Sequence, residues 1–210
     1  MKRYAQHCPL ARALDVVGER WNLLVVRELT LGPRRFRDLL DGLPGIPTNL
    51  LAARLKDLQA ASILTKRTLP PPTPVAVYEL TEAGQALRPA MRELRAWGAR
   101  FGPPPSESDS LRPAWLLLSA ANRPTDLPPA HTCELRVDGE HFQLSANESR
   151  LTVRGGPAEH PDGVITMATR TLYRLMAGQT TAIRQLTADG NAMVTRTAVE
   201  TLRGALSEQV

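Results

Sequence analysis

A run of three prolines, Pro103-Pro104-Pro105, followed by the small polar segment 106–110, interrupts the 210-residue chain near its midpoint. Proline has a fixed φ and no backbone N–H, so such a run cannot continue a helix or pair inside a sheet. No apolar periodicity crosses the segment. The sequence therefore predicts two domains, at residues 1–102 and 113–210, joined by a linker at 103–112.

The net charge of the chain changes sign at the same place. Residues 1–102 contain 16 Lys and Arg against 9 Asp and Glu, a net charge of +7, whereas residues 103–210 contain 10 against 12, a net charge of −2. A basic half joined to a mildly acidic half is typical of a nucleic-acid-binding module fused to a domain that does not contact nucleic acid. The alternative is a general bias toward arginine, since only 3 of the 26 basic residues are lysine.

Composition and motifs disfavour several classes of protein. The longest apolar runs, at 23–26 and 114–118, are far shorter than the roughly 20 residues of a membrane-spanning helix, so we expect no membrane span. The N-terminal segment has no apolar signal core, so we expect a cytoplasmic protein. Two cysteines cannot form a disulfide scaffold. Because the chain has no GxSxG, P-loop, HExxH or dinucleotide-binding motif, we expect no enzyme and no cofactor.

Apolar spacing in the first half predicts helices at residues 9–17, 21–29, 36–40 and 48–60. Two strands, 63–69 and 75–80, are expected to flank a hairpin tip at the proline-rich segment 70–74. Thr81 is then expected to cap a last helix that carries Leu87, Met91 and Leu94 on one stripe. This is the element order of a winged helix-turn-helix.

The expected helix at 48–60 has two faces. At 100° per residue, Leu51, Leu55 and Leu58 fall in one sector, and small or polar residues fall opposite. A helix that enters the major groove must bury one face and present small or polar side chains on the other. With the preceding helix and the wing, this gives ten candidate DNA-binding residues: Arg34, Arg35, Arg37, Thr48, Asn49, Ala52, Ala53, Lys56, Lys66 and Arg67.

Within this set the residue types suggest different roles. Asn49 can pair with an adenine edge, Lys56 can meet a phosphate, and the alanines permit a close approach to base edges. The arginines at 34, 35 and 37 and the basic residues of the wing are expected near phosphates. For Arg54, at the flank of the buried sector, two roles stay open: a contact to the DNA backbone, or a salt bridge that ties the helix to its neighbours.

Six motifs of the first half occur in order at characteristic spacings: Cys8-Pro9-Leu10-Ala11-Arg12-Ala13-Leu14, Gly18-Glu19-Arg20-Trp21, Gly32-Pro33-Arg34-Arg35-Phe36, Leu43-Pro44-Gly45-Ile46, Leu51-Ala52-Ala53-Arg54-Leu55 and Tyr78-Glu79-Leu80-Thr81-Glu82-Ala83-Gly84. Over residues 7–102 the chain resembles the HxlR family of bacterial transcriptional regulators. The resemblance implies a homodimer, with the first and last helices of the domain at its interface, that binds a palindromic DNA operator, with a repressor as the expected type of regulator. Two-fold symmetry then places the half-sites about one helical turn apart.

Two features qualify what the resemblance implies. Family members often have polar residues where this chain has Pro47, Ala52 and Ala53, so an operator sequence cannot be carried over. Trp21 and Trp97 invite a ligand-stacking role, but their positions on amphipathic helices favour core or dimer packing, and we assign them no site role.

Cys8 precedes Pro9 and is expected at the N-cap of the first helix, with Arg12 one turn further on. The helix dipole and the free amides there favour a thiolate, the reactive form of cysteine. Several HxlR-like regulators resemble this arrangement and sense oxidants or electrophiles, which makes Cys8 a candidate redox sensor. The alternative is a small side chain that packs at the dimer interface.

In the second half, Cys133, Leu135 and Val137 alternate with polar residues before Asp138-Gly139, a strong hairpin signal. A two-residue turn places these side chains opposite Leu144, Phe142 and Glu140. In that register His141 lies opposite Arg136, on the other face from Cys133. Because zinc needs ligands that converge from one side, we expect no metal site from His131, Cys133 and His141.

Further strands are expected at 151–153, 164–167 and 192–195, and helices at 169–177, 181–186 and 198–206. This order resembles sterol-carrier-protein-like domains, although Arg196 and Thr197 stand where such domains often have Gly-Asp. The expected fold class is therefore α+β, an N-terminal winged helix-turn-helix followed by a small α+β sterol-carrier-like domain. The second resemblance implies a cavity for a hydrophobic small molecule. The alternative is a domain for dimerisation or structure alone.

Two functions remain open from the sequence. The first is a homodimeric regulator whose affinity for double-stranded operator DNA changes with a hydrophobic effector in the second domain, or with the redox state of Cys8. The second is a carrier or storage protein for a hydrophobic ligand that uses a degenerate winged helix for dimerisation. The basic recognition face distinguishes the two, because only a regulator needs salt-sensitive, sequence-selective DNA binding.

Overall fold

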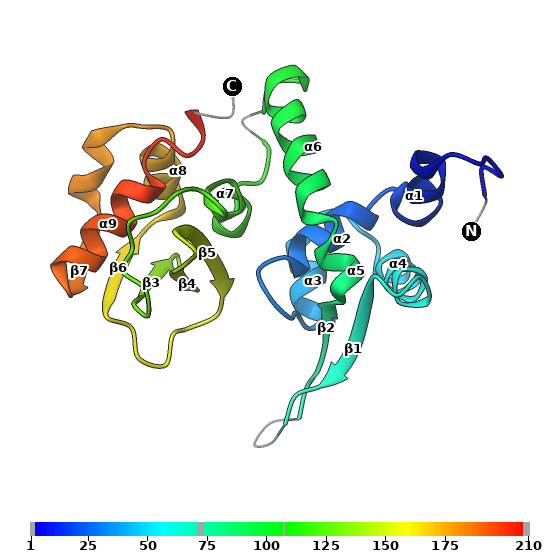
Figure 1. Ribbon diagram of the computed structural model, residues 1–210, viewed down its shortest axis with the longest axis horizontal. Coiled ribbons are helices and arrows are strands. Elements are labelled where there is room, and N and C mark those ends of the chain that lie inside the picture. The colour runs from blue at the N-terminus through cyan, green and yellow to red at the C-terminus, as the bar shows by residue number, and fades with distance from the viewer. Residues whose placement is uncertain (1–2, 71–73, 107, 208–210) are drawn as a thin grey trace. The chain divides into compact units, whose positions relative to one another are not determined.

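The computed structural model describes residues 3–70, 74–106 and 108–207. The chain forms two compact units that divide between Arg95 and Ala96, each described by itself below (Figure 1). Parts of three expected features lie outside the described residues: the first two residues of the chain, the hairpin-tip residues 71–73, and Glu107 of the expected linker. No helix of the described segments combines the length and the apolar character needed to cross a bilayer.

Four helices open the first unit: α1 (Pro9–Val17), α2 (Asn22–Leu29), α3 (Phe36–Gly42) and α4 (Thr48–Ala60). All four were predicted to within two residues. Pro9 occupies the first turn of α1, where its missing N–H removes no helical hydrogen bond. Between α3 and α4 the chain turns at Gly45, whose φ of 86° is a conformation that glycine adopts without strain.

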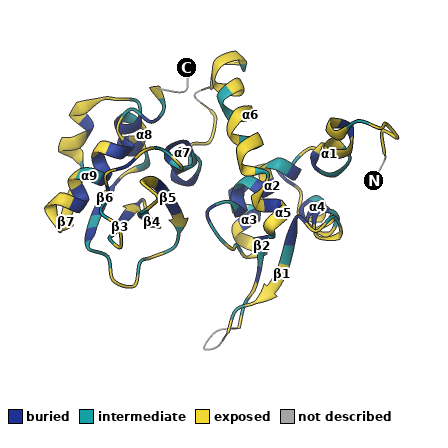
Figure 2. Ribbon diagram, in the orientation of Figure 1, coloured by how far each residue is buried: buried dark blue, intermediate teal, exposed yellow. Residues whose placement is uncertain are grey.

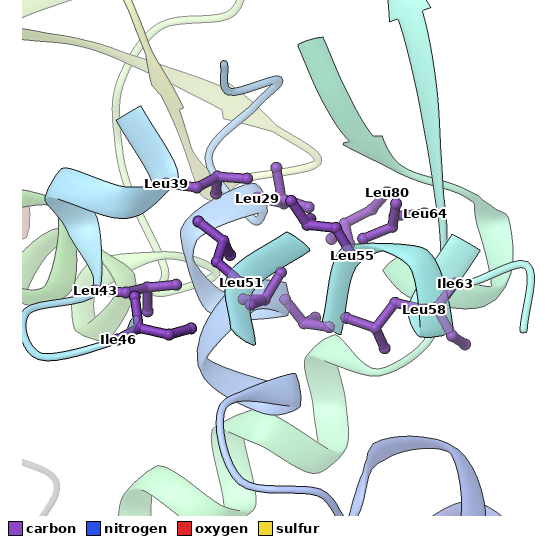
Figure 3. Packing of buried hydrophobic residues seen from close by; sticks show 12 residues of the cluster. Leu29, Leu39, Leu43, Ile46, Leu51, Leu55, Leu58, Ile63, Leu64 and Leu80 are labelled. Carbon is purple, nitrogen blue, oxygen red and sulfur yellow. The ribbon is translucent and has the colours of Figure 1, made fainter. Parts of the chain in front are cut away.

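The core of the first unit is a cluster of leucine, isoleucine and valine side chains (Figure 3). From α4, Leu51, Leu55 and Leu58 are each no more than 2% exposed and pack against Leu29 of α2 and Leu39 of α3. Burying a leucine stabilises a fold by roughly 1.5–3 kcal/mol. The inner face of α4 is therefore fixed by packing, as its sequence pattern predicted, and its outer face is left free for another role.

The wing consists of β1 (Leu64–Thr68) and β2 (Ala76–Leu80), paired antiparallel with Lys66 opposite Tyr78. A third segment joins it, which the sequence analysis did not predict. The N–H of Arg34 donates to the carbonyl of Tyr78 at 2.9 Å, and the N–H of Tyr78 donates to the carbonyl of Arg34 at 2.8 Å. A single bridge of this kind has no run of alternating apolar and polar residues from which it could be predicted.

The final helix of the winged domain is broken into two. Thr81 caps α5 (Glu82–Gln85), as expected, and its hydroxyl oxygen accepts from the N–H of Gly84 at 3.2 Å. A second helix, α6 (Arg88–Phe101), then begins. Pro89 explains the break, because a residue without an N–H is tolerated in the first turn of a new helix and not in the interior of a continuing one.

The second unit contains α7 (Pro113–Ala120), β3 (Thr132–Val137), β4 (Glu140–Asn147), β5 (Arg150–Gly155), β6 (Gly163–Met167), α8 (Thr169–Met176), the 3₁₀ helix η1 (Thr180–Gln185), β7 (Thr187–Gly190) and α9 (Ala192–Leu202). Its five strands form one sheet in the order β5-β4-β3-β6-β7. Only the β3–β6 pair is parallel. Helices α7 and α9 contact this sheet, so the unit is α+β.

The hairpin register in the second unit is the one predicted: Cys133 pairs with Leu144, Leu135 with Phe142 and Val137 with Glu140. The strand expected at 192–195 is wrong, because those residues form the first turn of α9. The side-chain oxygen of Asn191 accepts from the N–H of Met193 at 3.0 Å and thereby caps that helix. The strand at this edge of the sheet is β7, whose four residues are all exposed and show no apolar alternation that could have predicted it.

Candidate nucleic-acid interface

The outer face of α4 is exposed along its whole length. Thr48, Asn49, Ala52, Ala53 and Lys56 are all exposed, whereas the leucines one turn apart on the inner face are buried. Lys56 has no ion-pair partner among the described residues. The face therefore offers small side chains, one amide and one uncompensated positive charge, a combination that can approach base edges and phosphates.

Arginines flank this face at the start of α3. Arg35 and Arg37 are exposed and Arg34 is half-buried. The backbone N–H of Arg35 donates to the Asp38 carboxylate at 3.0 Å, which satisfies one of the free amides of the helix start. The bridge to Tyr78 fixes the backbone of Arg34 against the wing. The structure thus ties the arginine segment to both α3 and the wing.

The two basic residues of the wing have different surroundings. The ammonium group of Lys66 lies 5.7 Å from the centre of the Tyr78 ring and remains exposed. The guanidinium Nε of Arg67 lies 2.7 Å from a carboxylate oxygen of Glu79, two residues beyond its cross-strand partner on the same face. Sequence analysis did not identify Glu79 as part of the site, although its cross-strand spacing was the signal that could have done so. Of the two, only Lys66 has a charge without a carboxylate partner.

For Arg54, the structure selects one of the two roles left open by the sequence. Its side chain is 16% exposed and pairs with Asp57 on α4 at 3.3 Å. It also pairs with Glu19, in the turn between α1 and α2, at 3.4 Å. Arg54 therefore ties the helix to a neighbouring segment.

Cys8 is the N-cap of α1, as predicted, and is partly exposed. Its carbonyl accepts from the N–H of Arg12 at 3.0 Å, and its side chain makes no capping hydrogen bond. The next residue, Pro9, lines an open hollow of about 490 Å³ together with Arg3, Arg12, Ala13, Asp15 and Val16. Cys8 thus combines partial exposure with a position at a helix N-terminus, one turn before Arg12.

The second cysteine, Cys133, has the opposite environment. It is fully buried on the apolar face of β3. Burial, together with the adjacent Glu134 carboxylate, raises the pKa of the Cys133 thiol to about 12. It therefore remains a neutral thiol at physiological pH and reacts poorly with oxidants.

Much of α1 and α6 is exposed (Figure 2), and several of the exposed residues are apolar. Leu10 of α1 is 67% exposed, and Trp97 and Phe101 of α6 are each 61% exposed. No residue of α6 is buried. By contrast, Trp21 is half-buried against the core cluster, so one of the two tryptophans packs internally and the other does not. Exposed aromatic residues on one helix are typical of a surface that another molecule covers.

In the second unit, His131, Cys133 and His141 do not converge. His141 pairs with Arg136 across the hairpin, on the face opposite Cys133. Its Nδ1 lies 2.9 Å from the buried carboxylate of Glu134. Within the described segments, no three His, Cys, Asp or Glu side chains are grouped in a way that could hold a metal ion.

The first unit matches a known family. The HxlR-like helix-turn-helix family matches residues 16–106. The HTH-type transcriptional regulator YodB of Bacillus subtilis is 37% identical over 98 residues, which cover 46% of this chain and 88% of YodB. This chain belongs to the HxlR-like helix-turn-helix family. It is thus a DNA-binding transcriptional regulator in its first half, and the family resemblance stated from the motifs is confirmed there.

Other relatives match the same share of this HxlR-like chain. The regulator YvaP of Bacillus subtilis is 34% identical over 99 residues, or 46% of this chain and 91% of YvaP. Among solved structures, the reduced form of YodB from B. subtilis is 35% identical and covers 48% of this chain and all of its own, with a TM-score of 0.42. Each of these matches leaves more than half of this chain uncovered, so the resemblance of the second unit to sterol-carrier domains stays a prediction.

Proposed function

We propose that this HxlR-like protein is a homodimeric repressor that binds a palindromic operator through the outer face of α4. The observation that carries the proposal is the contrast between the two faces of that helix. Three buried leucines fix its orientation, and Asn49, Ala53 and Lys56 remain exposed on the other side. Asn49 would contact a base edge, Lys56 a phosphate, and Ala53 would allow the backbone of α4 close to the groove floor.

The flanking basic residues would extend this contact along the phosphates. Arg35 and Arg37 at the start of α3 and Lys66 on the wing are exposed. Arg67 would reach a phosphate only after leaving Glu79, from which it is 2.7 Å away. Each cation that meets a phosphate releases bound counterions, so affinity would fall steeply as salt rises.

Dimerisation in this proposal uses α1 and α6. The exposed Leu10 and Leu14 of α1 and Leu94, Trp97 and Phe101 of α6 are large apolar side chains that solvent alone does not stabilise. Isologous packing of these helices around a two-fold axis would cover them. It would also present two copies of α4 to the two halves of a palindrome.

Two kinds of signal would modulate the repressor. The first is oxidation or alkylation of Cys8, whose partly exposed position at a helix N-terminus beside Arg12 supports the proposal. The second is a hydrophobic small molecule bound by the second unit. What supports the second signal is the α+β architecture, in which helices contact one sheet, as in a sterol-carrier-like domain. No catalytic step is part of the proposal.

The test is a gel-shift titration of the full chain with a DNA fragment taken from beside its own gene, at several salt concentrations. We expect the fragment to bind more tightly than a scrambled fragment of the same length, with an affinity that falls as salt rises. Equal and weak binding to both fragments would overturn the regulator proposal and favour the hydrophobic-ligand carrier.

The cysteines give a separate test of the redox signal. We expect diamide to abolish operator binding by the wild type and to leave Cys8→Ser unaffected, and iodoacetamide to modify Cys8 but not the buried Cys133. Loss of binding by diamide-treated Cys8→Ser would show that Cys8 is not the sensor.

A further inference from the structure

The ion pair between Arg54 and Glu19 joins two parts of the first unit that the hydrophobic core holds to different degrees. Arg54 lies on α4, whose leucines are the centre of the core. Glu19 lies in the four-residue turn 18–21 that connects α1 to α2. The guanidinium Nη1 and the Glu19 carboxylate are 3.4 Å apart. The Arg54 side chain is 16% exposed and the Glu19 side chain is 54% exposed, so solvent screens this attraction from the Glu19 side only.

Apart from this turn, few buried side chains hold helix α1 to the rest of the unit. Only Ala11 and Val17 of its nine residues are buried, and Leu10 and Leu14 are exposed. None of the fully buried leucines of the core cluster comes from α1. Its last residues do contact the unit, since Val17 is buried and Val16 packs against the core cluster. The direction of α1 relative to the rest of the unit is therefore set at its C-terminal end, by these contacts together with the turn that follows.

The backbone of that turn is unusual. Trp21 has φ 84°, a left-handed conformation that costs a non-glycine residue on the order of 1–3 kcal/mol and persists only where neighbouring contacts enforce it. The Trp21 side chain packs against the core cluster, and two neighbouring side chains supply further contacts. The amide of Asn22 donates to the carbonyl of Val16 at 2.8 Å, and Arg54 attracts Glu19.

The polar atoms around the turn are not all satisfied. Asn22 is fully buried, and its Oδ1 has no hydrogen-bond donor among the described residues. The Nε of Arg54 is buried and also has no hydrogen-bond acceptor among the residues that the structure describes. Since buried polar groups are normally paired, these two atoms leave the side-chain hydrogen bonding around the turn incomplete. The link from Arg54 to Glu19 adds to the packing of Trp21 and the hydrogen bond of Asn22 in holding the turn.

We propose that the Arg54–Glu19 pair sets the position of α1 relative to α4 and thereby sets the half-site spacing that the dimer accepts. The inference rests on the proposed function, in which α1 lies at the dimer interface and α4 in the major groove. In a two-fold dimer the distance between the two copies of α4 depends on how each is held to its own interface helix. Arg54 is thus a positioning residue that contacts no DNA itself.

The second ion pair of Arg54 provides a matched control. Asp57 lies 3.3 Å from the same guanidinium but on the same helix, three residues away. Glu19→Gln and Asp57→Asn each remove one negative charge and one partner of Arg54. Only Glu19→Gln breaks the connection between α4 and the turn, so the two variants separate this connection from a general change in charge.

The first measurement follows the geometry without DNA. In a Cys8→Ser background, spin labels are attached at Ala13→Cys on α1 and Gln59→Cys on α4, and labelled chains are diluted with unlabelled ones. The label separation is then measured by pulsed electron resonance. We expect Glu19→Gln to broaden or shift the distance distribution, and Asp57→Asn to leave it unchanged. An unchanged distribution in Glu19→Gln, or equal changes in both variants, overturns the inference.

The second measurement uses the operator fragment and variants of it with one base pair added or removed between the half-sites. We expect Glu19→Gln to reduce the preference of the dimer for the natural spacing by up to about fivefold, the range of a single ion pair. Asp57→Asn should keep that preference. A purely structural role would lower the midpoint of thermal unfolding without changing the spacing preference, and that outcome also contradicts the inference.

The two proposals fail in different ways. If the wild type shows no operator selectivity while Glu19→Gln still broadens the label distances, the proposed function is wrong and the link between α1 and α4 stands. If the wild type is selective and Glu19→Gln retains its spacing preference, the regulator stands and the positioning role is wrong. A double-mutant cycle with Arg54→Lys adds a check, because residues acting through one pair give non-additive effects on the spacing preference.

Discussion

Lys56 on α4 and Glu134 on β3 are both charged side chains outside an apolar core, yet their surroundings differ. Lys56 is exposed and has no ion-pair partner in the described parts of the chain. Glu134 is buried and accepts hydrogen bonds from Arg136 at 2.7 Å, His141 at 2.9 Å and the N–H of Ala158 at 3.1 Å. The first arrangement leaves a charge available to another molecule, and the second uses the charge to hold its own fold together.

The same difference extends to the apolar side chains. Helices α1 and α6, the second of which continues past the division between the units, expose leucine, tryptophan and phenylalanine side chains. In the second unit, Leu135, Phe142, Leu144 and Ile165 are at most 1% exposed. The comparison indicates that α1 and α6 leave apolar surface that another molecule can cover, whereas the sheet of the second unit buries its own apolar face.

Replacing Glu134 should have the largest effect on stability. Glu134→Ala removes the common acceptor of three donors and leaves the N–H of Ala158 unpaired, so we expect a loss of about 3 kcal/mol in the free energy of unfolding of the second unit. Chemical denaturation with a probe in that unit measures this loss. Glu140→Ala, a half-buried carboxylate on the neighbouring strand, is the control and should cost less than half as much. Equal losses would contradict the anchoring role of Glu134.

The same carboxylate predicts a dependence on pH. Burial by itself would raise the pKa of Glu134, but the hydrogen bonds from Arg136, His141 and Ala158, with the charge of Arg136, outweigh it and lower the pKa below the ordinary value of 4.5. Its contribution to stability is therefore fully present above that value and is lost as the pH falls through the lower folded-state pKa. Acid titration should narrow the stability gap between wild type and Glu134→Ala only below about pH 4.5; a gap that already closes at neutral pH would contradict the assignment.

Replacing Asn49 tests the open face of the first unit. We expect Asn49→Ala to weaken operator binding by about 1–3 kcal/mol, with little change for scrambled DNA, because a base-edge contact is lost. Gln85→Ala removes an exposed amide from α5 and serves as the control. Gel-shift titrations of both variants on both fragments measure the effect. An equal loss of affinity for operator and scrambled DNA would show that Asn49 takes no part in base recognition.

Replacing Lys56 should have a smaller effect that is independent of sequence. We expect Lys56→Ala to weaken binding to operator and scrambled DNA alike, and to reduce the slope of log affinity against log salt by about 0.9. Arg196→Ala removes one exposed positive charge from α9 of the second unit and should leave the slope unchanged. A slope that responds equally to both variants would mean that net charge, not a phosphate contact, is responsible.

The last expected effect, no larger than that of Lys56, concerns the paired charge of the first unit. Glu79→Gln frees Arg67 from its ion pair, so we expect tighter binding to scrambled DNA and a salt slope steeper by about 0.9. Glu82→Gln makes the same charge change at an exposed carboxylate on α5 that has no arginine partner among the described residues. If both variants bind DNA alike in a salt series, Arg67 does not contact phosphate even when released.

Sequence patterns predicted the elements whose signals are local. The buried leucines of α4, the Thr81 cap and the β3–β4 register each follow from spacing or turn chemistry within a few residues. The features that were missed depend on contacts between distant segments. The bridge of Arg34 to Tyr78 spans more than 40 residues, and β7 is a strand only because β6 lies beside it.

The candidate site shows the same limit. Exposure of Asn49, Ala53 and Lys56 followed directly from helical periodicity. The ion-pair partners of Arg54 and Arg67 could not be predicted in this way, because the sequence does not show whether an arginine side chain faces DNA or a carboxylate. Only the fold shows that Glu19 and Glu79 lie beside them.

The central claim is that the outer face of α4 lies in the major groove of operator DNA. Disulfide trapping tests it directly: Ala53→Cys in a Cys8→Ser background is mixed with operator DNA that carries a thiol tethered to a major-groove base edge. We predict efficient cross-linking from position 53 and none from Ala99→Cys, an exposed alanine on α6. No cross-link from position 53, or equal cross-linking from both positions, would contradict the account.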